Sequence, residues 1–267
     1  MKLAPVIHTR TFSCDFNSEF MVRPNDFSDC TVKWARKQVL IATSSIDNLN
    51  GERWLIADNG EFRIAGIVSF IKNLSLKCSL SDDEKKVAEE FFYDDKGRSV
   101  YAFIGIVIKE GEAINNLSLS YDYFWKLYLK HIKPIWKRSF IETVMCDYEN
   151  YNSTVSVDKS VLSAKQKIGQ TAFFETSPVN DRQIFENLLN QDIQKKFLFC
   201  SNITDINVIR KNKFSVITTS GNVITRVQRD VETQNGDIEE EHGGSVKPGD
   251  NDDMKELQNL KKGVFYR

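Results

Sequence analysis

The sequence is poor in the residues from which most reactive and metal-binding sites are built. Only three histidines occur in 267 residues, and His8, His131 and His242 lie far apart. The five cysteines are odd in number and never closely spaced, so neither a disulfide framework nor a CxxC site is expected. The motifs GxxxxGK[ST], GxSxG and HExxH are all absent. We therefore predict no catalytic residues, no metal and no cofactor, and we expect a protein that acts by binding.

Long apolar runs are missing as well. The longest, Tyr101–Ile108, falls far short of the roughly 20 residues that a membrane-spanning helix needs. The N-terminal stretch MKLAPVIHTR lacks the apolar core of a signal peptide. With 41% hydrophobic and 27% charged residues, the chain has the composition of a globular protein. We expect a cytoplasmic protein without a membrane partner.

Apolar periodicity and turn residues predict an α/β or α+β fold, with a mixed central sheet of five or more strands and flanking helices. The clearest feature is a β-hairpin, in which Asp58-Asn59-Gly60 joins the apolar runs Trp54–Ala57 and Phe62–Ile71. The carboxylates of Asp58 and Glu61 are expected at its exposed turn. A second apolar strand, Arg98–Lys109, repeats the Gly-Ile-Val of the hairpin. Gly66 and Gly105 are therefore predicted to let a neighbouring backbone or helix come close.

Helix starts are marked by capping residues. Ser81 and Glu84 form a capping box, and Ser120 is a second N-cap before an apolar stripe. An earlier helix is expected to end near Ala42. Its predicted apolar stripe consists of Thr31, Trp34, Ala35, Val39 and Ala42. Its predicted outer face carries Lys33, Arg36 and Lys37.

Composition divides the chain into four segments. Residues 1–147 form a predicted N-terminal α/β half and residues 155–229 a C-terminal α/β half, which contains a helix at Asp181–Ile193 and a final hairpin through Ser220-Gly221-Asn222. Residues 230–253 are polar and rich in breakers, so a disordered acidic linker is expected there. Residues 254–267 form a short C-terminal motif.

The segment Phe173–Leu189, FFETSPVNDRQIFENLL, resembles the part of small GTPases in which a strand ends in E-T-S-A-K and a helix follows. The resemblance implies a strand, a loop and a helix at these residues. Pro178 departs from the family pattern, and neither the phosphate-binding loop nor NKxD is present. The chain consequently lacks the groups that cradle and neutralise phosphates.

Two further functional classes are considered. A divergent metal-dependent nuclease would need converging carboxylates from a set that includes Asp58, Glu61, Asp94, Asp95 and Glu110. Alternatively, basic residues beside aromatics can bind DNA or RNA. The candidates for that role are Lys133, Trp136, Lys137, Arg138, Arg210, Lys211, Lys213, Arg226 and Arg229.

Charge is distributed unevenly along the chain. From Asp230 onward there are ten acidic and five basic residues, against 27 acidic and 31 basic residues in 1–229. The acidic linker is expected to screen the basic segment Arg210–Arg229 that precedes it. Without a reactive motif, the favoured function is a non-catalytic accessory or scaffold subunit of a bacterial or phage multi-protein system, with other protein subunits as partners.

The C-terminal motif generates the first prediction. Leu257, Leu260, Val264, Phe265 and Tyr266 restore apolar character after the polar linker, so we predict that they bind a partner protein. Truncation after Lys262 should weaken complex formation in a pull-down while leaving the Tm nearly unchanged. A large loss of Tm would instead mean that these residues pack on their own protein.

Overall fold

The computed structural model describes residues 1–16, 20–49, 51–114, 116–152, 164 and 166–240. The chain divides into two compact units, Met1–Arg226 and Val227–Arg267. The strands are β1 (Lys2–Thr9), β2 (Val22–Pro24), β3 (Arg53–Asp58), β4 (Phe62–Phe70), β5 (Tyr101–Lys109), β6 (Val144–Cys146), β7 (Glu149–Asn150), β8 (Gln166–Ile168), β9 (Thr171–Glu175), β10 (Phe197–Cys200) and β11 (Val216–Thr219). The helices are α1 (Asp29–Ala42), η1 (Ile46–Asn48), α2 (Ile71–Leu76), α3 (Asp82–Glu89), α4 (Tyr121–Ile132), η2 (Lys133–Ile135), α5 (Pro178–Leu189), α6 (Ile206–Lys211) and α7 (Gly221–Glu240).

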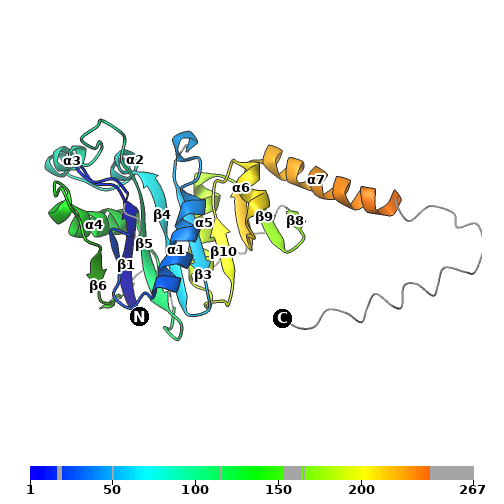
Figure 1. Ribbon diagram of the computed structural model, residues 1–267, viewed down its shortest axis with the longest axis horizontal. Coiled ribbons are helices and arrows are strands. Elements are labelled where there is room, and N and C mark those ends of the chain that lie inside the picture. The colour runs from blue at the N-terminus through cyan, green and yellow to red at the C-terminus, as the bar shows by residue number, and fades with distance from the viewer. Residues whose placement is uncertain (17–19, 50, 115, 153–163, 165, 241–267) are drawn as a thin grey trace, which may run out of the picture. The chain divides into compact units, whose positions relative to one another are not determined.

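One mixed sheet of 11 strands runs through the first unit in the order β6-β2-β1-β5-β4-β3-β10-β11-β9-β8, with β7 paired to β1 (Figure 1). The strands from β1 to β3 in this order are antiparallel, and β10, β11 and β9 are parallel to one another. The predicted fold class, a mixed sheet with flanking helices, is confirmed. Strands from both predicted α/β halves meet in this sheet, because β10 pairs with β3. No helix within the described residues combines the length and apolar character that a membrane crossing requires.

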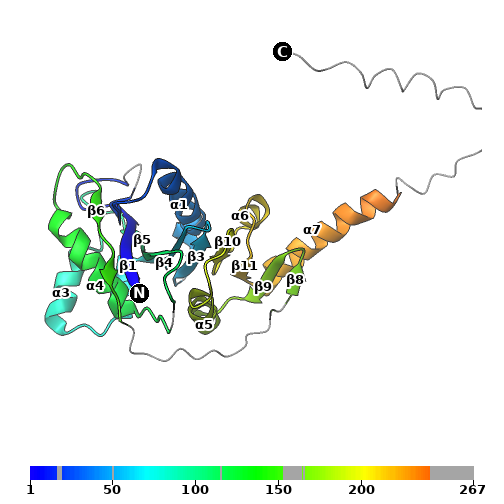
Figure 2. The ribbon, with the colours of Figure 1, turned by 90° about the horizontal axis from the view of Figure 1, so that it is seen from below.

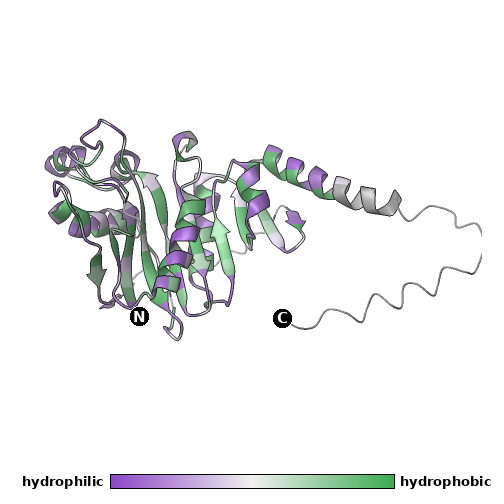
Figure 3. Cartoon of the chain, in the orientation of Figure 1, coloured by the Kyte–Doolittle hydropathy of each residue, from purple (hydrophilic) through white to green (hydrophobic). Residues whose placement is uncertain are grey.

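Helices cover both faces of the sheet. Figure 2 shows α1 and α6 on one side, the α1–α6 face, and α3, α4 and α5 on the other, the α4–α5 face. Apolar residues concentrate on the strands, while hydrophilic residues mark the outward sides of the helices (Figure 3). Such two-sided covering is the reason that β4 and β5 read as nearly continuous apolar runs in the sequence.

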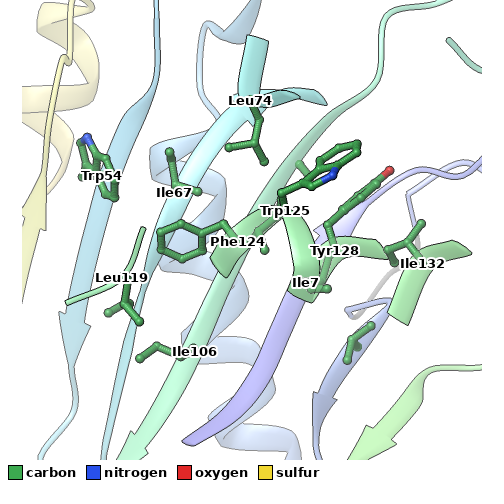
Figure 4. Packing of buried hydrophobic residues seen from close by; sticks show 14 of the residues in the cluster. Ile7, Trp54, Ile67, Leu74, Ile106, Leu119, Phe124, Trp125, Tyr128 and Ile132 are labelled. Atoms are coloured by element: carbon green, nitrogen blue, oxygen red, sulfur yellow. The ribbon is translucent and has the colours of Figure 1, made fainter. Parts of the chain in front are cut away.

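The main core lies on the α4–α5 face. Phe124 and Tyr128 of α4 are fully buried; Figure 4 shows Phe124 near Ile67 and Ile106 of the central strands and Tyr128 near Ile7 of β1. The side chains meet here because α4 presents residues three and four apart, while β4 and β5 present every second residue. The caps predicted at Ser81 and Ser120 are confirmed, and each begins a helix.

The predicted role of the two strand glycines is also confirmed. Gly66 and Gly105 face each other across β4 and β5. A Cβ atom on Gly66 would lie 2.3 Å from the Ile104 carbonyl oxygen and 2.5 Å from the Gly105 Cα. The close neighbour is therefore backbone, and any larger residue would push the two strands apart.

The predicted hairpin is confirmed as β3 and β4, but the expectation for one of its carboxylates is wrong. Glu61 is exposed, whereas Asp58 is 3% exposed and accepts two hydrogen bonds from Arg63, at 2.8 and 2.7 Å. The guanidinium of Arg63 also donates to four backbone carbonyls. Two belong to the last residues of α5, Leu188 and Leu189, and two follow the helix, at Gln191 and Asp192. Carbonyls at and beyond a helix end lack the usual helical donors and need others when buried; that of Leu188 also accepts from the Gln191 N–H at 3.2 Å.

Two further predictions fall in the C-terminal part. The expected hairpin after β11 is wrong, because α7 begins at Gly221 and extends to Glu240, so residues 230–240 at the start of the predicted linker are helical. Val223, Val227 and Val231 recur every fourth residue, a helical spacing that the β-branched residues obscured. The rest of the linker and the whole C-terminal motif lie outside the described residues.

The buried pair generates a stability prediction. Arg63→Met should lower the free energy of unfolding by about 3–5 kcal/mol, because it leaves the Asp58 carboxylate buried without its partner. The double variant Asp58→Leu/Arg63→Met should recover only part of this loss, since the α5 carbonyls still lack donors. Lys130→Met is the control and should cost less than about 1 kcal/mol, because Lys130 and Glu149 form an exposed ion pair. Urea denaturation measures all three, and a full recovery in the double variant would contradict the role given to the carbonyls.

Candidate functional site

The basic residues predicted to bind nucleic acid are not brought together. Lys133, Lys137 and Arg138 lie in and after η2, which continues α4, whereas Arg210 and Lys211 form the last turn of α6. These two groups belong to opposite faces of the sheet (Figure 2). All five side chains are exposed, as are those of Lys213, Arg226 and Arg229, but Arg226 and Arg229 belong to different units.

Trp136 is not available to stack on a base. Its side chain is 3% exposed and lies against the rings of Phe91 and Phe12, with centroids 5.0 and 6.2 Å away. The proposed stacking role is therefore wrong, because Phe91 and the α4–η2 segment enclose the indole in the core. The neighbouring cations form a solvated rim.

Of the carboxylates considered for a nuclease, Glu61, Asp95 and Glu110 are exposed, whereas Asp58 and Asp94 are buried and held by arginines. Asp58 pairs with Arg63, and Asp94 pairs with Arg98 and Arg10. Although burial opposes ionisation of Asp94, hydrogen bonds from Arg98 and Lys96 lower the pKa of this carboxyl below its usual value. Within the described residues, no three His, Cys, Asp or Glu side chains converge as metal ligands. The two buried acids are structural partners of cations.

A groove with a volume of about 700 Å³ lies between α1 and α6. It is lined by Asp29, Val32, Lys33, Arg36, Lys37, Leu40, Ile41, Ser44, Val208 and Asn212. We call it the α1–α6 groove. None of these residues is aromatic, and three are cations against a single carboxylate.

The local sequence explains how α1 forms one wall of this groove. Ser28 accepts a hydrogen bond from the Thr31 N–H at the start of the helix. The buried residues of α1, which include Ala35 and Val39, turn one side of the helix toward the sheet. The remaining side carries Lys33 and Lys37 into solvent, as the sequence predicted.

The opposite wall is the short helix α6. Asp205 caps it by accepting from the Asn207 N–H at 2.8 Å, and Asn212 closes its other end by donating to the Val208 carbonyl at 2.8 Å. Val208 faces the groove between these caps. Arg210 and Lys211 extend the positive surface beyond the groove.

Two features of the groove call for a binding partner. Leu40 is 45% exposed on the charged side of α1, and it lines the groove together with the partly exposed Val208 of α6. The Nε–H of Arg36 is buried and has no acceptor among the described residues. An apolar group and an acceptor supplied together by a ligand would satisfy both.

The sequence reading missed this site although it contained a signal. The helical pattern predicts only an outer face at Lys33, Arg36 and Lys37 and gives Leu40 no role. Leu40 falls outside the predicted apolar stripe, three residues after Lys37 and four after Arg36, so it shares their side of the helix. The contribution of α6 has no local signal, because about 170 residues separate it from α1 in the chain.

Comparison with protein families, with curated protein sequences and with solved structures returns no match to this chain.

The position of Trp136 generates the third prediction. Trp136→Ala should lower the free energy of unfolding by about 3–5 kcal/mol, because it empties a buried aromatic cluster. Lys137→Glu, one residue away on the exposed rim, should change it by less than about 0.5 kcal/mol. Denaturant titration of both variants is the measurement. An unchanged stability of Trp136→Ala would reopen a surface role for this residue.

Proposed function

We propose that the protein is a non-catalytic subunit of a bacterial or phage multi-protein assembly in the cytoplasm, and that its α1–α6 groove binds an acidic amphipathic helix of a partner protein. The observation that carries this proposal is the pairing of the exposed Leu40 with three cations in one groove. An amphipathic helix binds such a groove by placing apolar anchors on its floor. Acidic residues beside the anchors then meet the lysines and arginine on its rim.

The dimensions of the groove fit one helix of this kind. The wall formed by α1 has 14 residues, which corresponds to ~21 Å at 1.5 Å per residue. A partner helix of about four turns would therefore span it. Val32 and Ile41 are already buried, so the apolar residues of the groove that would lose water on binding are Leu40 and the partly exposed Val208.

The chemistry of the lining favours a peptide over a nucleic acid. Single-stranded nucleic acid is held by aromatic side chains that stack on bases as well as by cations. The groove lining contains no aromatic residue; apart from Asp29, Ser44 and Asn212 it consists of cations and aliphatic residues. Phosphate contacts alone would leave Leu40 exposed to water, whereas a leucine-bearing helix covers it.

A designed peptide tests the proposal. The probe is a fluorescent 14-residue helix with leucines on one face and glutamates on the other, compared with a scrambled peptide of equal composition and with labelled single-stranded DNA. The amphipathic peptide should bind about tenfold tighter than the scrambled one, a difference of about 1.4 kcal/mol that reports the apolar face. Leu40→Asp should remove this preference, and the double variant Lys33→Glu/Lys37→Glu should weaken the binding of both peptides.

Controls separate the groove from general electrostatics. Lys130→Glu changes an exposed cation on α4 and should leave peptide affinity unchanged. Equal binding of the two peptides would remove the helix-in-groove proposal. Tighter binding of DNA that is lost in the double lysine variant would favour the nucleic-acid alternative instead.

A further inference from the structure

A second concave site lies at the edge of the sheet where β9 and β10 end and β3 begins. It has a volume of about 170 Å³ and is lined by Gly51, Glu52, Trp54, Lys77, Thr176, Ser177, Pro178, Asp181 and Asn202. Ligands of α/β proteins commonly bind outside the carboxyl ends of parallel strands. Here the parallel strands contribute the segments around Thr176 and Asn202, and the antiparallel β3 contributes Glu52 and Trp54.

One carboxylate of this pocket is already compensated. Glu52 is 6% exposed, accepts from the Tyr121 hydroxyl at 2.5 Å and pairs with the Lys77 ammonium. The ring of Tyr121 lies in turn beneath the Lys77 and Arg182 cations, each about 5.1 Å from its centroid. Glu52 therefore helps to shape the wall and needs no further partner.

The other carboxylate, that of Asp181, has one oxygen atom without a hydrogen-bond partner among the described residues. Asp181 is 4% exposed, and its Oδ2 accepts from the Thr176 hydroxyl at 2.8 Å. Its Oδ1 has no hydrogen-bond partner among the described residues. Burial raises the pKa of Asp181 and the nearby Glu52 charge adds to that effect, although hydrogen bonds from Thr218, Thr176 and the Ser177 backbone oppose it. No basic side chain forms an ion pair with Asp181 within the described part of the chain.

An orphan donor lines the same pocket. Trp54 is 1% exposed, and its Nε1–H has no acceptor among the described residues. The indole is fixed by the Phe185 ring, whose centroid is 4.6 Å away. Its backbone is fixed as well, because the Trp54 N–H donates to Ser201 Oγ at 2.8 Å. A buried donor and a buried acceptor without partners are each costly, so their presence in one pocket indicates a ligand.

The geometry points to a small organic cation as this ligand, with an ammonium group that donates to Asp181 Oδ1 and a neighbouring carbonyl oxygen that accepts from Trp54 Nε1. The ammonium provides the basic partner that the Asp181 carboxylate lacks. The carbonyl oxygen provides the acceptor that the Trp54 Nε1–H lacks. A cavity of about 150 Å³ accommodates one benzene molecule, so five or six non-hydrogen atoms fit here. This site is separate from the α1–α6 groove and does not rest on the function proposed for it.

Three probes isolate the two interactions. Glycinamide carries both an ammonium and a carbonyl, acetamide carries the carbonyl without the ammonium, and ethylamine carries the ammonium without the carbonyl. Each is titrated into the ¹⁵N-labelled full chain while the four tryptophan indole N–H resonances are observed, with Trp54→Phe used for assignment. The Tm at saturating probe is the second readout.

Glycinamide should shift the Trp54 resonance selectively, at a half-saturating concentration about tenfold below that of acetamide or ethylamine. Asp181→Asn keeps the shape of the side chain and the acceptor for Thr176. It should raise the half-saturating concentration of glycinamide to that of acetamide. In Trp54→Phe, binding is measured by the rise in Tm. Glycinamide should then raise the Tm no more than ethylamine does. Asp83→Asn, which changes an exposed carboxylate on α3, should alter nothing.

The proposal fails if glycinamide leaves the Trp54 resonance in place, if the three probes bind equally well, or if binding of glycinamide survives Asp181→Asn. Loss of peptide binding to the α1–α6 groove would have no bearing on these outcomes.

Discussion

Two buried arginines in the central hairpin connect the sheet to the helices on both of its faces. Arg63 on β4 points to the α4–α5 face and binds the carbonyls at the end of α5, with Asp58 as its counter-ion. Arg53 on β3 points to the other face and donates to the Ala42 and Ser44 carbonyls at the end of α1. Each guanidinium satisfies carbonyls that the helix geometry leaves without donors, and the negative end of a helix dipole favours its charge.

The two arginines differ in how their charge is compensated. Arg63 has a carboxylate partner, whereas Arg53 has backbone carbonyls. Burial lowers the pKa of Arg53, and the charges of Cys200 and Asp205 oppose this shift. A guanidinium stays charged in either setting because its pKa is so high, which a lysine at the same place would not guarantee. The planar fork also reaches several carbonyls at once, and this explains why one side chain organises an entire helix terminus.

Arg53 links the two candidate sites. Its Nη1 holds the end of α1, which forms one wall of the α1–α6 groove, and its Nε donates to the Asn202 carbonyl at 3.1 Å beside the small pocket. Asn202 adopts a left-handed backbone conformation, with φ of 52°. Such a conformation costs energy in a residue other than glycine and is held by its surroundings. The bond from Arg53 and the bond from the Asn202 N–H to Thr218 Oγ1 at 2.8 Å provide that restraint.

The sequence by itself determined the features that depend on chemistry within three or four residues. The Asn59-Gly60 turn, the capping box of Ser81 and Glu84 and the backbone contact at Gly66 are of this kind, since each relies on local hydrogen bonds or on the absence of a Cβ atom. The tertiary structure decided the rest. Asp58 is buried because Leu188–Asp192, about 130 residues later, brings carbonyls to its arginine, and Trp136 is buried because Phe91 lies against it. Both sites likewise join segments that only sheet formation brings together. Long-range contacts decide whether a charge or an indole is buried, and no local sequence pattern encodes those contacts.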